Sequence, residues 1–295
     1  MDIASLARLL ILGAIWGGSF VFMRICVPVL GPTLLVEARL GFGALFLLAV
    51  GAVLGKHLHI RKHWRTYLLL GFFNSALPFL LFAYAANTLP TAALAILNAM
   101  APIWGGLITA LRERAAPSAM PLAGMLLAIS GVILLANSGD VSMMPGATSA
   151  VLAGLGAALS YAIAGVLAGT RKSVDPYANA HGSMWAATLL VAPALPFFPA
   201  HSSPDAHVVA AALALGVVCS GIAYLLYFRL IADLGPTSAL TVTFLIPVFG
   251  VLWGVLFLDE RPGWHTLAGC VSVLLGTALV TGLFKNRSRP SERVG

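Results

Sequence analysis

The stretch LPTAALAILNAMAPIWGGLITALRER (residues 89–114) is an apolar run with Asn98, Pro102 and a Gly-Gly pair near its middle. A proline inside a helix removes one backbone hydrogen bond and clashes with the preceding turn. A second stretch, GPTSALTVTFLIPVFGVLWGVLFLDER (residues 235–261), has the same features in the same order: Pro-Thr, Ala-Leu, a central proline, a glycine and a final Glu-Arg. The chain therefore contains an internal repeat.

The similarity continues beyond these two stretches, at a spacing of 145 to 147 positions. The matched residues are Pro90, Thr91, Ala93, Leu94, Pro102, Gly105, Glu113, Arg114, Leu122, Ala123, Gly124 and Gly131 in the first copy, and Pro236, Thr237, Ala239, Leu240, Pro247, Gly250, Glu260, Arg261, Leu267, Ala268, Gly269 and Gly276 in the second. At a spacing of 145, Trp16 also falls on Tyr161. Glycine-rich apolar helices can resemble one another by chance, but the shared order favours a duplication. We expect one repeat in residues 1–140 and another in residues 141–295.

The composition excludes a soluble globular protein. The chain is 60% hydrophobic and only 9% charged, whereas soluble domains have about 25% charged residues. Ten apolar stretches approach the roughly 20 residues that a membrane-spanning helix needs. They are residues 6–28, 33–54, 66–87, 91–111, 118–137, 148–169, 177–198, 207–230, 238–258 and 264–284. Because lipid offers no partners to backbone polar groups, these spans must be helices.

Each half of the chain contains five predicted spans, and five is an odd number. The second half must therefore enter the membrane in the opposite orientation to the first. Inverted repeats are typical of transporters that bind substrate near the bilayer midplane, at the repeat interface. The sequence thus predicts an all-α integral membrane protein with ten transmembrane helices, built from two inverted five-helix repeats.

The 17 Lys and Arg residues indicate the orientation, because cytoplasmic loops are enriched in them. With the N-terminus in the cytoplasm, most of them fall on the inner side. These are Arg8, Lys56, Arg61, Lys62, Arg65, Arg112, Arg114, Arg171, Lys172, Arg229, Lys285, Arg287, Arg289 and Arg293. Both termini are therefore predicted in the cytoplasm, with the chain in a bacterial inner membrane. The net charge of +7 is then a topology signal and not a nucleic-acid-binding patch.

Several motifs resemble a known family. The first span carries Trp16-Gly17-Gly18-Ser19-Phe20, which is similar to the WGxxF pattern of the drug/metabolite transporter superfamily, and Pro32 precedes Arg39 by seven residues. Each half ends with a proline-centred helix, an acidic-basic turn and a Leu-Ala-Gly motif. This order resembles the paired EamA domains of ten-helix exporters, including YddG-like aromatic amino-acid exporters.

The resemblance implies a basket of ten helices around a central cavity. It also implies export of amino acids or related metabolites, and in some members of toxic organic cations.

A site for a small amphipathic substrate should be mostly apolar and aromatic, with a few polar groups. The residues of these kinds that the spans place near mid-depth are Trp16, Asn74, Pro78, Tyr84, Asn98, Pro102, Tyr161, Trp185, Tyr224, Thr243 and Pro247. Aromatic faces can stack on an aromatic substrate or hold an organic cation. Helix packing is the alternative role for the aromatic residues, and an interhelical hydrogen bond is the alternative for the two asparagines.

Charged residues within spans default to a functional hypothesis, because charge in a membrane is costly. Arg24 and Glu37 lie at similar depths on neighbouring spans, so we expect them to pair, either structurally or in an outer gate or proton pathway. Arg39 lies deeper, where it either extends outward to the interface or points into the cavity and attracts a carboxylate or lipid phosphate.

Other functional classes have weaker support. His59 and His63 are four residues apart, a spacing that can bind metal on a helix, but they lie in a basic loop. The motifs of hydrolytic enzymes and of channel filters are absent from the sequence. We therefore expect a small-molecule substrate and the lipid bilayer as partners, and neither a cofactor nor a metal. The sequence is compatible with a monomer but leaves the oligomeric state open.

Overall fold

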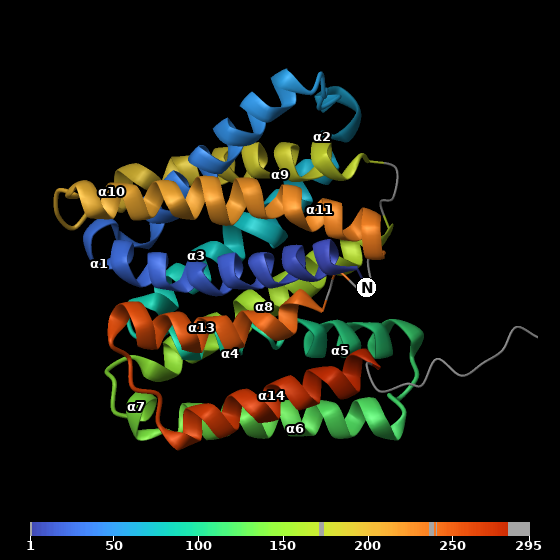
Figure 1. The fold of residues 1–295 in the computed structure, drawn as a ribbon, viewed down its shortest axis with the longest axis vertical. Coiled ribbons are helices and arrows are strands. Elements are labelled where there is room, and N and C mark those ends of the chain that lie inside the picture. The colour runs from blue at the N-terminus through green and yellow to red at the C-terminus, as the bar shows by residue number, and fades with distance from the viewer. Residues whose placement is uncertain (1, 171–173, 236–238, 240, 283–295) are drawn as a thin grey trace, which may run out of the picture.

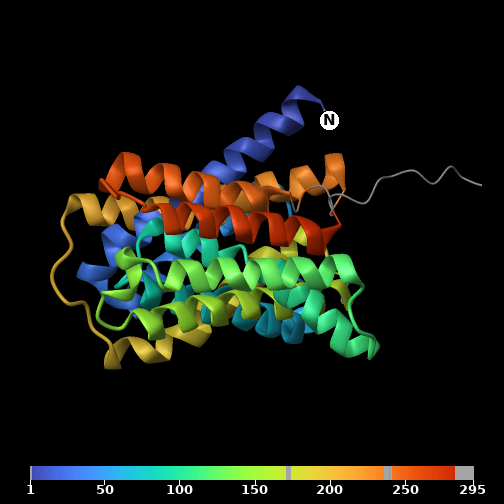
Figure 2. The same ribbon diagram turned by 90° about the horizontal axis from the view of Figure 1, so that it is seen from below.

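The computed structural model describes residues 2–170, 174–235, 239 and 241–282 (Figure 1). Within these ranges the regular structure is helical, without strands. Among the described residues, seven helices are long and apolar enough to cross a membrane, and Val242–Leu258 is a shorter apolar helix. Most of the helices run along one common direction, and the N-terminal part of α1 leans away from its neighbours (Figure 2). The chain is therefore a multi-pass membrane protein, as predicted.

The first two spans are joined within one helical run, α1, from Ile3 to Val53. Gly31 interrupts it with a φ of 71° and a ψ of 164°, and Pro28 and Pro32 lie on either side. Each proline removes a helical hydrogen bond, and the glycine adopts a conformation that other residues rarely reach. The chain can therefore reverse direction within a few residues.

We expect Gly31→Ala to lower the stability of the protein by about 1–3 kcal/mol, the usual cost of such a backbone conformation for a residue with a Cβ atom. The added Cβ would also lie 3.3 Å from His201 Nε2. Thermal unfolding in detergent measures the effect. Gly41→Ala is a matched control on the same helix, because a Cβ there meets nothing within 4 Å. Equal midpoints for both variants would contradict the prediction.

The other eight spans are formed by thirteen described helical segments. In chain order they are α2 (Ile60–Gly71), η1 (Phe72–Ala76) and α3 (Leu77–Ala86); α4 (Thr91–Asn98) and α5 (Ala101–Glu113); α6 (Ala119–Ala136); α8 (Ala147–Thr170); α9 (Pro176–Val191); α10 (Ala206–Leu213), η3 (Ala214–Ile222) and α11 (Ala223–Leu234); α13 (Val242–Leu258); and α14 (Trp264–Thr281). The short α7 (Gly139–Ser142) and the 3₁₀ turn η2 (Ala192–Phe197) lie in or beside connections. The predicted ten-helix architecture is confirmed.

The two repeated proline stretches fold differently. In the first, α4 ends at Asn98 and α5 begins at Ala101, so the helix breaks just before Pro102. The Thr277 hydroxyl of α14 donates to the Ala99 carbonyl at this break, with a distance of 3.1 Å. In the second stretch, Pro247 lies inside the continuous helix α13.

Helices α6 and α14 lie side by side and relate the two halves directly (Figure 1). A Cβ on Gly124 would lie 2.6 Å from the Gly276 carbonyl oxygen, and a Cβ on Gly131 would lie 2.8 Å from that of Gly269. The repeat matches Gly124 with Gly269 and Gly131 with Gly276. Exchanging the two halves therefore converts each glycine contact into the other, as a pseudo-two-fold axis requires.

The other contacts between the halves follow the same exchange. The first span packs against α13, and its counterpart α8 packs against α4 and α5. The second span packs against η3, while its counterpart α9 packs against α2 and η1. The structure is therefore built from two inverted repeats whose helices interlock.

Some sequence predictions fall outside the described residues. They concern the repeat positions Pro236, Thr237 and Leu240, and the cations Arg171, Lys172, Lys285, Arg287, Arg289 and Arg293.

Candidate substrate site

Two π-helical segments occupy equivalent places in the repeats. They are η1 in the third span and η3 in the eighth. A π-helical segment shifts the backbone hydrogen bonds from i→i−4 to i→i−5, and such segments are frequent at functional sites. In η3, the Ser220 hydroxyl donates to the carbonyl of Leu215, five residues earlier, at 3.3 Å. The segments thus present side chains that a regular α-helix would place elsewhere.

An aromatic and polar cluster lies between these segments. Asn74 Nδ2 of η1 donates to the Tyr224 hydroxyl at 2.9 Å. The Trp16 ring meets the Tyr224 ring edge-on at 6.4 Å, and Trp16 Nε1 donates to the Cys219 carbonyl at 3.2 Å. The cluster therefore joins α1, η1, η3 and α11, and both repeats contribute to it.

Phe82 extends the cluster toward α8. Its ring centroid lies 5.4 Å from that of Phe20 and 6.2 Å from that of Tyr161, on which it stacks. Trp16 and Tyr161, which are matched by the repeat, thus approach the cluster from opposite halves. The structure brings together four sequence-predicted residues: Trp16, Asn74, Tyr161 and Tyr224.

Arg39 is the charged centre of this cluster. Arg39 is only 5% exposed, so of the two positions predicted for its side chain, the outward extension to the interface is wrong. Arg39 Nε donates to Ser220 Oγ at 2.9 Å, and the guanidinium carbon lies 3.6 Å from the centroid of the Phe79 ring. The two phenols Tyr161 and Tyr224 are close enough to interact with its charge.

A carboxylate partner for Arg39 is missing from the part of the chain that the structure describes, where the ion pairs involve Arg8, Arg24, Lys56 and Arg229. At the spacing of 145, the equivalent of Arg39 in the second repeat is Met184. The cluster is therefore asymmetric and carries a buried positive charge on one side.

Sequence reasoning missed Ser220 and Phe79. A serine or phenylalanine in an apolar run carries no signal of its own. The repeat offered one clue, since Ser220 corresponds to Ser75 and Phe79 to Tyr224 at the same spacing.

The remaining candidates lie elsewhere on these helices. Tyr84 is 47% exposed and its hydroxyl bonds Ser149 Oγ at 3.0 Å. Trp185 Nε1 donates to His181 Nε2, one turn away on the same helix, at 2.9 Å. The other candidates lie within the helices or at their ends. Pro78 and Pro247 are buried in α3 and α13. Asn98 and Pro102 are half-buried beside the α4–α5 break, and half-buried Thr243 lies in the first turn of α13.

An apolar cavity of about 610 Å³ lies beside the cluster. Its lining comes from α1, α10, η3 and α13, and includes Phe22, Cys219 and Trp253. Since Cys219 also accepts the Trp16 hydrogen bond, the cavity and the cluster share a wall.

The predicted pair of Arg24 with Glu37 is wrong. Arg24 Nε lies 4.0 Å from Glu260 Oε1, and Arg24 also donates to the Ala86 carbonyl at 3.0 Å. Glu260 Oε1 accepts the Thr91 backbone N–H at 2.8 Å, so it caps the start of α4. Glu37 Oε2 is buried without a hydrogen-bond partner in the described structure. The Glu260 contacts therefore hold three spans together at the end of the bundle opposite the N-terminus.

We expect Glu260→Ala to destabilise the protein by about 1.5–3 kcal/mol, since hydrogen bonds to charged groups have this size. The variant leaves the α4 amide uncapped and Arg24 without its carboxylate. Glu113→Ala is the matched control, because Glu113 is the exposed repeat equivalent. Unfolding midpoints in detergent compare the two, and equal losses would refute the role given to Glu260.

Glycines on different helices have different surroundings. A Cβ on Gly17 would lie 2.7 Å from the Phe249 Cβ, and one on Gly250 would lie 2.4 Å from the Ala95 Cβ, so these helices pack closely. At Gly105 and Gly165, an added Cβ meets nothing within 4 Å. The helices therefore pack closely around α13, whereas Gly105 of α5 and Gly165 of α8 have room for a side chain.

Comparisons with known proteins agree with this architecture. The family model described as "EamA-like transporter family" matches residues 5–137 and 148–282. An uncharacterized transporter of Archaeoglobus fulgidus is 25% identical over 290 residues, which cover 90% of this chain and 93% of that protein. The uncharacterized transporter YvbV of Bacillus subtilis is 23% identical over 293 residues, covering 95% and 92%.

A solved crystal structure has the same fold, with a TM-score of 0.68 at 20% identity, covering 98% of this chain and all of that one. Two inverted repeats and two matches of one family model lead to the same assignment. The chain belongs to the EamA-like transporter family.

Proposed function

We propose that this membrane transporter exports small amphipathic amino acids, aromatic or neutral, together with related carboxylates. One observation carries the proposal: Arg39 is buried among aromatic rings, without a carboxylate partner in the described residues. A buried charge is costly unless it is both paired with an opposite charge and hydrogen-bonded, and the Ser220 hydroxyl provides only a hydrogen bond. A substrate carboxylate would supply the missing negative charge.

The aromatic residues suit the rest of such a substrate. Rings of Trp16, Tyr224 and Tyr161 offer faces and edges against which an apolar or aromatic side chain can pack. Asn74 and Tyr224 add a hydrogen-bonding pair. A mostly apolar site with a few placed polar groups is the usual form of a small-molecule site.

Organic cations are the alternative substrates, because aromatic rings also bind cations. The position of Arg39 counts against them. Its guanidinium already covers the Phe79 ring, and its charge would repel a second cation in the same space.

Transport proceeds, in this proposal, by alternating access between the inverted repeats, with both termini in the cytoplasm of a bacterial cell. The close packing around α13 and the Glu260 contacts support a state closed at the outer end. Inverted repeats allow the opposite state by exchange of their conformations.

Counterflow in liposomes tests the substrate. Purified protein in liposomes preloaded with an unlabelled amino acid is expected to accumulate the labelled compound saturably, for neutral and aromatic amino acids. Tetraphenylphosphonium and ethidium serve as the cation panel. Counterflow of the cations without any carboxylate substrate would overturn the proposal.

A further inference from the structure

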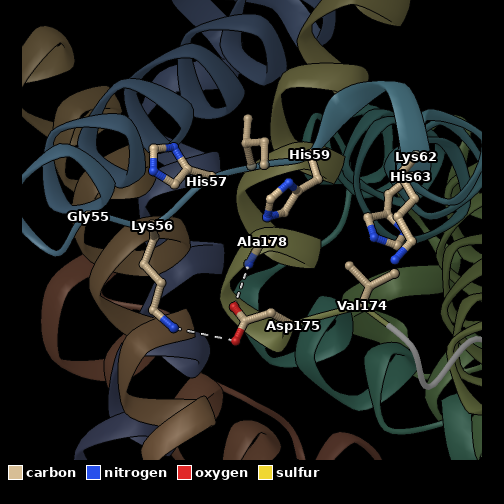
Figure 3. A pocket seen from close by; sticks show the side chains of 10 residues that line it. Gly55, Lys56, His57, His59, Lys62, His63, Val174, Asp175 and Ala178 are labelled. Carbon is tan, nitrogen blue, oxygen red and sulfur yellow. Dashed lines mark hydrogen bonds and ion pairs between the residues drawn. The ribbon is translucent and has the colours of Figure 1, made fainter.

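A second cavity, of about 380 Å³, lies at the end of the bundle where α1 ends and α2 and α9 begin (Figure 3). It is separate from the aromatic cluster. Its lining includes Lys56, His57, His59, Lys62 and His63. Two lysines and three imidazoles thus surround a space large enough for a small polar group.

The carboxylate of Asp175 also lines this cavity, and other groups already engage it. Lys56 Nζ lies 3.5 Å from Asp175 Oδ2, and Asp175 Oδ1 accepts the Ala178 N–H at 3.1 Å to cap α9 (Figure 3). Lys62 and the imidazoles line the same space, and the single carboxylate of Asp175 does not balance the charges of both lysines.

The start of α2 adds to the positive field. His59 precedes the helix with a φ of 48° and makes no side-chain capping hydrogen bond, and the first turn of α2 contains no acidic residue. Helix N-termini carry a partial positive charge and unpaired N–H groups, which favour anions. The cavity therefore suits an anion, whereas its lysines would repel a metal cation.

Exposed apolar side chains flank the residues of this basic cavity in the sequence. Val53 is 85% exposed, Leu54 60%, Ile60 61% and Trp64 47%. In a membrane protein, exposed apolar residues beside lysines mark the level where acyl chains meet headgroups. A phosphate bound in the cavity would thus have lipid chains beside it.

We propose that this cavity binds a phosphate group, supplied by an anionic phospholipid of the adjoining leaflet. Lys62 and His59 contact the phosphate at the positive end of α2, and the chains of the lipid lie along Val53, Leu54, Ile60 and Trp64. Basic pockets between spans on the cytoplasmic side are a general mode of lipid headgroup recognition. The site does not depend on the identity of the transported substrate.

The double variant His59→Asn/Lys62→Gln tests the site. Asparagine tolerates the positive φ of His59, and both positions are exposed, so the fold is expected to persist. Arg112→Gln/Arg114→Asn is the control, since it removes two charges from the matching end of α5 and leaves the cavity intact. Equal unfolding midpoints without lipid would establish that all three proteins are folded.

Binding is measured by thermal shift of full-length protein in detergent, titrated with phosphatidylglycerol, phosphatidylcholine or inorganic phosphate at constant ionic strength. Wild type and control are expected to bind phosphatidylglycerol most tightly. The His59→Asn/Lys62→Gln variant is expected to bind it about fivefold more weakly, as removal of one lysine charge near a membrane surface implies.

The comparison of ligands identifies the source of the phosphate. If inorganic phosphate stabilises the protein, phosphatidylglycerol does not, and the double variant loses this effect, then the cavity binds phosphate from a soluble anion and not from a lipid. Equal phosphatidylglycerol binding by wild type and double variant would overturn the proposal, and so would an equal loss in the control.

Discussion

Replacing Arg39 with methionine, the residue at the equivalent position of the second repeat, is expected to abolish measurable transport of amino acids. Arg39 provides the positive charge of the aromatic cluster. Truncating one partner of a buried charge pair typically costs about 2–5 kcal/mol, which corresponds to a loss of affinity of roughly 30-fold or more. Methionine fills similar space in a buried site at Met184, so the helix packing is expected to tolerate the change.

Substrate pairs separate the charge effect from a general loss of shape. Phenylalanine and phenethylamine differ by the carboxylate that Arg39 is proposed to bind. Arg39→Met should weaken binding of phenylalanine strongly, while binding of the amine should stay the same or improve, because a repelling charge is gone. Thermal-shift titration of purified protein measures both. An equal loss for the two compounds would show that Arg39 supports the shape of the site and does not bind the carboxylate.

The second large effect is expected at the crossing of α6 and α14. Gly124→Leu places a side chain against the Gly276 carbonyl oxygen, 2.6 Å from the new Cβ, and 2.8 Å from the Leu279 Cβ. A backbone carbonyl in a packed helix cannot move aside as a flexible side chain does. Overpacking of this kind costs about 1–3 kcal/mol, and we expect the upper end of this range because the two helices must separate.

Gly165→Leu is the matched control for this prediction. An added Cβ at Gly165 in α8 meets nothing within 4 Å, and leucine favours helix formation more than glycine does. The control should therefore unfold at or above the wild-type midpoint in detergent, while Gly124→Leu unfolds well below it. A wild-type midpoint for Gly124→Leu would contradict the close crossing of the two helices.

The architecture was predictable because the bilayer restricts it. Apolar length identifies spans, and an odd number of spans in each repeat requires inversion. The repeated glycines were also visible, but a repeat does not say which glycine meets which. The reciprocal contacts of Gly124 with Gly276 and of Gly131 with Gly269 needed the structure, since they depend on how the helices cross.

The site was predictable only in part. Depth and residue type selected Trp16, Asn74, Tyr161 and Tyr224, which the structure brings together. The same criteria also selected Tyr84, whose side chain is exposed and bonds Ser149 instead of joining the cluster. The π-helical turns rotate later residues relative to a regular helix, and hydropathy carries no trace of that rotation.

The partner of Arg24 shows a different limit. A short connection between two spans made Glu37 the nearest acid in sequence. Inversion of the second repeat instead brings Glu260 to the same end of the bundle as Arg24. A contact between the two halves can be derived from sequence only when the packing of the halves is already known.

The reciprocal glycine crossing has a mechanical consequence. Suppose the two repeats exchange conformations: the Gly124–Gly276 contact becomes Gly131–Gly269, and the reverse, so the crossing looks the same before and after. The contacts of Glu260 have no equivalent in the first repeat, because its counterpart Glu113 is exposed. The α6–α14 crossing can thus keep the same contacts in both states of an alternating-access cycle. The contacts of Glu260 would then break at one end of the bundle, and Glu113 would form the equivalent contacts at the other end.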